Sequence, residues 1–98
     1  MLRWTERAAT DLIAIGDYIA ADNPAAARTW VEKLRQRAVK ASTVPGSGRV
    51  VPEIGRVDVR EVFQRTYRIV YRVVDDGIVV LTVFESHRLL GKLDPDEG

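Results

Sequence analysis

Three segments in the C-terminal half of the sequence are rich in β-branched and aromatic residues, and they constrain the fold more than any other feature. They run from Val57 to Phe63, from Tyr67 to Val74 and from Ile78 to Glu85, and the short sequences QRT and DDG separate them. The DG pair is a frequent turn between two antiparallel strands. Connections this short join neighbouring strands that run in opposite directions, so the sequence predicts a three-stranded antiparallel meander.

The middle segment, YRIVYRVV at residues 67–74, carries two arginines among apolar residues. Side chains alternate across a strand, so one face would hold Tyr67, Ile69, Tyr71 and Val73, and the other Arg68, Val70, Arg72 and Val74. Charged side chains are rarely buried without a partner, which predicts that the arginine face is open to solvent. On this interpretation Arg68 is exposed and functional, and Arg68→Ala should leave folding nearly intact.

The N-terminal half predicts a short edge strand, MLRW, followed by two amphipathic helices. Thr5 is placed to cap the first helix, while Asn23 and Pro24 suit the N-cap and the first position of the second. Apolar residues recur at helical spacing, along the first helix at Ala8, Leu12, Ile15 and Ile19, and along the second at Ala27, Trp30, Val31, Leu34, Ala38 and Ala41. The short connection makes the two helices an antiparallel hairpin.

Together these elements predict an α+β fold of the order β-α-α-β-β-β. After the N-terminal strand, an antiparallel helical hairpin packs on one face of a small antiparallel sheet. We expect a single domain over residues 1–91, because 98 residues is near the usual size of one domain. The polar and acidic residues 92–98 are expected to form a flexible tail.

The composition excludes several kinds of site. The chain has no cysteine and one histidine, which excludes disulfides and thiolate ligands and argues against a metal site built from protein side chains. We therefore expect no metal and no cofactor. No apolar run approaches the roughly 18 residues of a membrane span, and we expect a cytoplasmic protein.

Charge is distributed unevenly along the chain. Residues 28–72 hold 11 Lys/Arg against 4 Asp/Glu, whereas both flanking segments are net acidic and the total is +1. A basic middle segment suggests an anionic or acidic partner, although solvated helix and strand faces would give the same pattern.

One polar constellation has the residue types for catalysis. The strand ends would bring Arg60, Arg68, Glu85, His87 and Arg88 toward one end of the open face, with Glu53 from the preceding loop. Cleavage of RNA through its 2′-hydroxyl needs a base, an acid and cations that stabilise a charged phosphorane, and these residues can supply them. Alternatively, the histidine and last arginine only end a strand, and Glu53 is a loop carboxylate paired with a nearby arginine.

Several motifs resemble the RelE/ParE superfamily of bacterial type II toxins. They are AATDLIAIGDYIAADNPAAA, then SGRVVPEIG, then VREVFQRTYRIVYRVVDDGIVVLTVFESHR, and the likeness runs over roughly residues 3–90. The resemblance implies a helical hairpin against an antiparallel sheet. It also implies a cognate antitoxin, whose disordered segment folds across the toxin, and hence a hetero-oligomeric complex.

The superfamily contains two mechanisms, and the residues that match each pattern help to choose between them. RelE-like members cleave mRNA on the ribosome, whereas ParE-like members poison DNA gyrase. Arg68 and Arg88 match the two arginines of the RelE pattern, but Val59 and Glu61 stand where that pattern has lysines. Glu53 and Arg68 match a second nuclease pattern, in which His87 falls about one residue out of register, a slip that turns a strand side chain to the other face.

The pieces SGR-VPE and REV are more typical of ParE-like sequences, so a ParE-like toxin acting on DNA gyrase is favoured. A RelE-like ribosome-dependent endonuclease and an inactive toxin fold that only binds its antitoxin remain alternatives. The catalytic candidates for the nuclease are Glu53, Arg68, His87 and Arg88. Target-binding residues are expected at Arg60, Arg68, Arg72 and Arg88, and antitoxin-binding residues at Leu12, Ile15, Trp30, Arg35 and Arg37.

Overall fold

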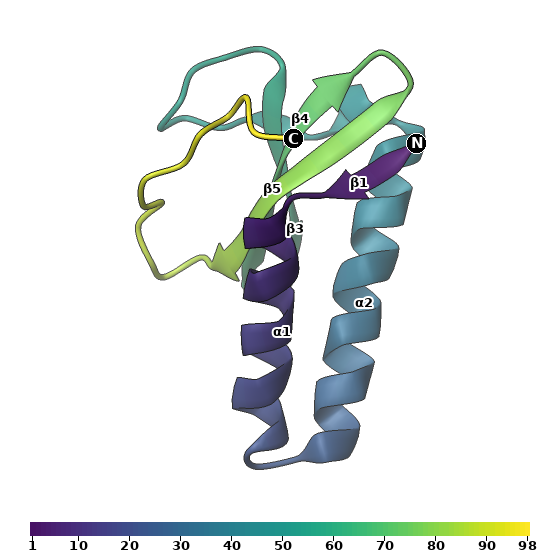
Figure 1. The fold of residues 1–98 in the computed structure, drawn as a ribbon, viewed down its shortest axis with the longest axis vertical. Helices are drawn as coiled ribbons and strands as arrows, with labels where there is room; N and C mark the ends of the chain where they lie inside the picture. The colour runs from purple at the N-terminus through teal and green to yellow at the C-terminus, as the bar shows by residue number, and fades with distance from the viewer.

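Five strands form one sheet and two long helices cover one of its faces in the computed structural model, which describes residues 1–98 (Figure 1). The elements in chain order are β1 (Leu2–Trp4), α1 (Glu6–Ala20), α2 (Pro24–Thr43), a 3₁₀ turn η1 (Pro45–Ser47), β2 (Arg49–Val50), β3 (Val59–Gln64), β4 (Tyr67–Val74) and β5 (Gly77–Glu85). The strand order across the sheet is β1-β5-β4-β3-β2. The predicted α+β class and element order are therefore confirmed.

The sheet is mixed rather than purely antiparallel. Strands β2 to β5 pair antiparallel with their neighbours, but β1 pairs parallel with β5, with Leu2 opposite Ile78. β1 and β5 run in the same direction, although the helical hairpin and three other strands separate them in the chain. The two-residue strand β2 was not predicted, since a segment so short has no alternation to detect.

The predicted helix starts are confirmed in detail. The side chain of Thr5 accepts a hydrogen bond from the backbone N–H of Ala8, and the side chain of Asn23 accepts one from Ala26. Each cap satisfies a backbone donor that the first helical turn leaves without a partner. Pro24 occupies the first position of α2, where no backbone donor is lost.

The face of the sheet toward the helices forms the larger hydrophobic core. Its buried members are Ala8, Leu12, Leu34, Ala38, Ala41, Val62, Ile69, Tyr71, Ile78, Val80 and Val83. Small alanines on α2 let this helix approach the strands closely, while the hydroxyl of Tyr71 donates to the carbonyl of Pro45. The predicted inward face of β4 is therefore confirmed.

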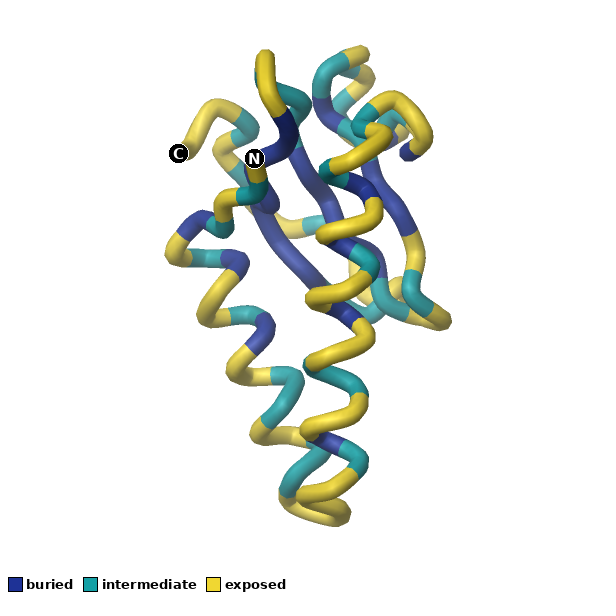
Figure 2. The backbone as a smooth tube through the Cα atoms, turned by 90° about the vertical axis from the view of Figure 1, so that its right-hand side faces the viewer, coloured by how far each residue is buried: buried dark blue, intermediate teal, exposed yellow.

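The opposite face of the sheet is not open, which corrects the expectation from the sequence. A second cluster lies there and consists of Val51, Val59, Val70, Val79 and Leu81. Ile54 from the loop after β2, and Leu90 and Leu93 from the C-terminal segment, pack over this cluster. Valines alternate onto both faces of the meander, so the second face also has to be removed from water. Figure 2 shows the central strands as a continuous buried layer.

Two helix side chains close the exposed edges of the sheet. At the β5 edge beyond β1, Asp11 accepts hydrogen bonds from the hydroxyl of Thr82 at 2.5 Å and the backbone N–H of Val83 at 3.2 Å. At the β3 edge beyond β2, Nε of Arg37 donates to the carbonyl of Phe63. These contacts occupy strand-edge groups that would otherwise pair with another chain. No helix is both long and apolar enough to cross a membrane.

We predict that valines on the second face contribute to stability as core residues do. Val70→Ala, at a residue with 0% exposure, should lower the free energy of unfolding by about 2 kcal/mol because a cavity remains beneath the covering segments. Urea denaturation measures this loss. Val57→Ala is the control, since this valine is 72% exposed, and a result in which both variants unfold alike would contradict a buried second face.

Candidate functional site

Arg68, the residue on which the sequence-based interpretation centred, lies on the second face of β4. It stands opposite Phe63 of β3 and Phe84 of β5 in the strand register. The residue is only 7% exposed, so the expectation that it is a surface residue was wrong. Its face was assigned correctly, but the loop after β2 covers it.

The guanidinium of Arg68 is held by two carboxylates. Nε donates to Glu61 at 2.6 Å, while Nη1 and Nη2 donate to the two oxygens of Glu53 at 2.8 and 2.9 Å. The second pair is bidentate, the strongest geometry available to an arginine and a carboxylate. The guanidinium carbon also lies 4.9 Å from the ring centre of Phe84.

Glu61 extends the network to the edge of the sheet. Its side chain is completely buried, and its second oxygen accepts a hydrogen bond from Nε of Arg49 at 2.5 Å. Arg49 in turn lies over the ring of Phe63, 5.3 Å from its centre. Two arginines and two glutamates thus alternate in sign, and the cluster as a whole is neutral.

A tight turn after β2 brings Glu53 over the sheet. The backbone N–H groups of Ile54 and Gly55 both donate to the carbonyl of Val51, and Gly55 has a φ of 71°. Glycine adopts this left-handed conformation without strain, so the loop can reverse and return across β3. The contact between Glu53 and Arg68 confirms the alternative prediction that Glu53 is a loop carboxylate paired with a nearby arginine.

The network shifts the pKa values of Glu53 and Arg68. The hydrogen bond from Arg68 lowers the pKa of Glu53 to about 2, while the two carboxylates raise the pKa of Arg68. Glu53 is therefore ionised at neutral pH and is a weak base, because a general base works best with a pKa near the operating pH.

The remaining members of the predicted constellation lie at the end of β5. Nδ1 of His87 lies 2.8 Å from Glu85, and the other oxygen of Glu85 accepts a hydrogen bond from Thr66. Burial opposes ionisation of Glu85, but the hydrogen bonds from His87 and Thr66 outweigh it and lower the pKa of this carboxyl. Arg88 is exposed and its side chain makes no hydrogen bond or ion pair. No hydrogen bond or ion pair joins this group to Arg68 and Glu53.

Arg60 and Arg72, expected to bind a target, hold backbone segments in place. Arg60 donates to the carbonyls of Val57 and Gly48 at 2.9 and 2.8 Å. Arg72 donates to the carbonyls of Pro95 and Glu97 at 2.9 and 3.1 Å. Both arginines therefore use, within the chain, donors that the sequence-based prediction assigned to a target.

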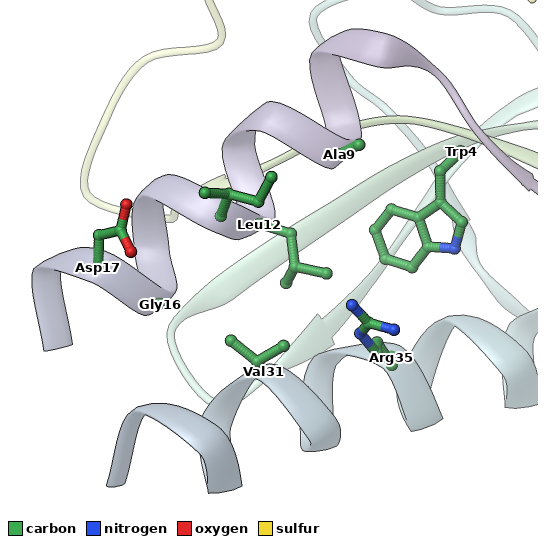
Figure 3. Close-up of a pocket in the computed structure, with 8 residues that line it drawn as sticks. Trp4, Ala9, Leu12, Gly16, Asp17, Val31 and Arg35 are labelled. Atoms are coloured by element: carbon green, nitrogen blue, oxygen red, sulfur yellow. The ribbon is translucent and has the colours of Figure 1, made fainter. Parts of the chain in front are cut away.

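A groove of about 500 Å³ runs between the two helices (Figure 3). It is lined by Trp4, Ala9, Leu12, Ile13, Gly16, Asp17, Val31 and Arg35. The side chain of Arg35 projects from α2 into the space between the two helices (Figure 3). A second hollow shares four of these residues and continues the groove toward the helix connection past Arg28.

The five residues expected to bind an antitoxin divide between two sides of the helical hairpin. Leu12 and Arg35 line the groove. Ile15 packs partly buried against the core, Trp30 contacts the ring of Tyr67 at 5.8 Å, and Arg37 bonds to β3. The sequence interpretation missed Trp4 and Gly16, and a glycine in the middle of a helical pattern was the available sign of close packing. A Cβ at Gly16 would lie 3.0 Å from Val31 on the other helix.

We predict that Arg68→Ala strongly destabilises the fold, the reverse of the expectation from sequence. The change leaves Glu61 buried with Arg49 as its only cation, and breaking a buried ion pair in this way costs about 3 kcal/mol. Glu53→Gln is the matched control, since Glu53 is 39% exposed and should cost no more than about 1 kcal/mol. Equal urea midpoints for the two variants at pH 7 would contradict a structural role for Arg68.

Comparisons with known proteins agree with the geometry. The model of the ParE toxin of the type II toxin–antitoxin system parDE matches residues 2–90. A solved structure described as a chromosomal ParDE toxin–antitoxin system from P. aeruginosa is 27% identical, with a TM-score of 0.67, over 86% of this chain and 92% of that chain. No curated protein sequence matches the chain. Because the family model spans nearly every residue of the fold, the chain belongs to the ParE toxin family.

Proposed function

We propose that this chain is the toxin of a type II toxin–antitoxin pair, that it acts on DNA gyrase, and that a cognate antitoxin neutralises it in a hetero-oligomeric complex. Family membership and the similarity to a ParDE system support the toxin role. Gyrase as the target places the site of action in the cytoplasm.

The arrangement of Arg68 is the observation that favours gyrase over RNA cleavage. An arginine that stabilises a phosphorane has to present free donors to phosphate. Here all three nitrogens of the guanidinium donate to Glu53 or Glu61, and both carboxylates would repel a phosphate at this position. The carboxylate that would serve as base has a pKa of about 2. A binding function therefore fits these residues better than acid–base catalysis.

One observation keeps the nuclease as a second candidate. Glu85 and His87 form an exposed acid–base pair at the end of β5, and Arg88 follows directly. An endonuclease would have to work with this group and without Arg68. The third class, an inactive toxin fold, shares every contact described above and differs only in its effect on cells.

The groove between the helices is the proposed seat of the antitoxin. Its floor is apolar, and Arg28 and Arg35 on its α2 side form no ion pair within the chain, while the carboxylates that line it are Asp17 and Glu32. An amphipathic segment with apolar anchors and acidic residues placed against the two arginines complements such a surface. The neighbouring reading frame is the natural source of that partner.

We predict that the purified chain inhibits DNA supercoiling by gyrase and that Arg88→Ala weakens this inhibition at least tenfold. Arg88 is the one expected target contact whose side chain is exposed and unbonded, so its loss should not change the melting temperature. Supercoiling assays and induction of the DNA-damage response measure the effect. Lys92→Ala, a nearby exposed cation with a free side chain, is the control.

Cleavage of mRNA in a translating extract, with gyrase unaffected, would move the assignment to the endonuclease. In that case His87→Gln should abolish cleavage. A chain that binds the antitoxin but affects neither gyrase nor translation would establish the inactive class.

We predict that Arg35→Glu weakens antitoxin binding at least tenfold, because it places a carboxylate beside the acidic segment of the partner. Isothermal titration with the protein encoded by the adjacent gene measures the loss. Lys40→Glu changes charge equally on the same helix but lies outside the groove, so it should bind nearly as well as the unmodified chain. Equal losses for both variants would show a general electrostatic attraction instead of docking in the groove.

A further inference from the structure

The C-terminal segment returns across the second face of the sheet after β5 ends. Figure 1 shows it, in yellow-green to yellow, leaving β5 and looping back to end beside the sheet. Leu90 and Leu93 pack against the cluster that contains Val70 and Leu81. Leu89, by contrast, is 93% exposed. Leu90 and Leu93 therefore anchor the segment on the sheet, whereas Leu89 does not.

Four arginines from four separate parts of the chain bond to this segment. Arg72 of β4 donates to the carbonyls of Pro95 and Glu97, and Arg3 of β1 donates to the carbonyl of Gly98 at 3.1 Å. Arg7 of α1 donates to the carbonyl of Lys92. Arg56 pairs with Asp96 at 3.0 Å. We call these arginines and the valine cluster beneath them the tail-binding surface.

The form of these contacts is that of peptide recognition. Four of the bonds go to backbone carbonyls, which any peptide offers, while the leucines and acidic side chains supply the selectivity. Three acidic residues, Asp94, Asp96 and Glu97, lie within this segment against a surface rich in arginine. The surface therefore holds a short segment that includes a turn, in which the backbone N–H of Glu97 donates to the carbonyl of Asp94, and it does so by chemistry that is not unique to its own tail.

We propose that the tail-binding surface is a docking site for an acidic, leucine-bearing segment of a partner protein, and that residues 90–98 occupy it in the free chain. This proposal rests on the contacts of the tail and not on the toxin activity or the groove between the helices. A tethered segment is present at an effective concentration on the order of millimolar. A partner segment must therefore bind tightly enough to displace the tail, or bind a chain whose tail is already weakened.

The experiment uses the full chain and a fluorescent peptide with the sequence of residues 90–98, LGKLDPDEG, followed by fluorescence polarisation. Leu93→Asp weakens the resident tail and should bind the peptide at least tenfold more tightly than the unmodified chain. Leu89→Asp adds the same charge at a residue that is 93% exposed and should behave like the unmodified chain. Adding Arg72→Gln to Leu93→Asp should reverse the gain, because two hydrogen bonds to the peptide are lost.

Equal affinity of Leu93→Asp and Leu89→Asp would overturn the proposal, and so would a gain that survives Arg72→Gln. A second measurement does not depend on a destabilising variant. The chain has no cysteine, so a spin label at Glu97→Cys is unique. We expect a restricted label that millimolar peptide sets free, whereas a label already mobile without peptide would show that the tail is not a resident ligand.

Discussion

The sheet has two apolar faces and only one layer of helices, and this constraint governs the rest of the structure. The helices remove one face from water through regular packing. The other face is covered by a loop and a tail, whose backbone groups have no helix or strand ladder in which to pair. Irregular segments at a buried surface need hydrogen-bond partners from elsewhere. Arg72, which projects from β4 on this face, provides them for the tail by bonding to the carbonyls of Pro95 and Glu97.

The ion pair between Arg68 and Glu61 follows from the same need. A buried pair is rarely a net gain over apolar side chains of the same size, because desolvation offsets most of the attraction. What the pair adds is a fixed orientation. Glu61 holds Nε of Arg68, so the two terminal nitrogens face outward, where they bind Glu53 and fasten the loop over the valine cluster. An arginine that resembles a catalytic residue in sequence thus serves here to close the second face.

The parts of the fold that local sequence determines were predictable. Helix caps, the hairpin connections and the two faces of β4 each depend on residues within a few positions of one another. The parallel pairing of β1 with β5 and the cover of the second face depend on contacts between distant segments, and neither leaves a periodic pattern. The burial of Arg68 had one available sign, since Glu61 shares its face on the adjoining strand. The same limit applies to the candidate site. Leu12 was predicted from the apolar stripe of the first helix and Arg35 from the basic side of the second, but Trp4 reaches the groove from another element.

The groove and the end of β5 are linked through α1, which bears on how a bound partner would act. Leu12 forms part of the groove floor and also belongs to the buried core. Its neighbour Asp11 bonds to Thr82 and Val83, a few residues before Glu85 and His87. The helix therefore cannot shift toward a partner without breaking both core packing and these hydrogen bonds. A groove held this firmly is preformed, so binding loses little free energy to reorganisation. Under the proposed function, an antitoxin in the groove would neutralise the toxin by covering its surface and not by reshaping the end of the sheet.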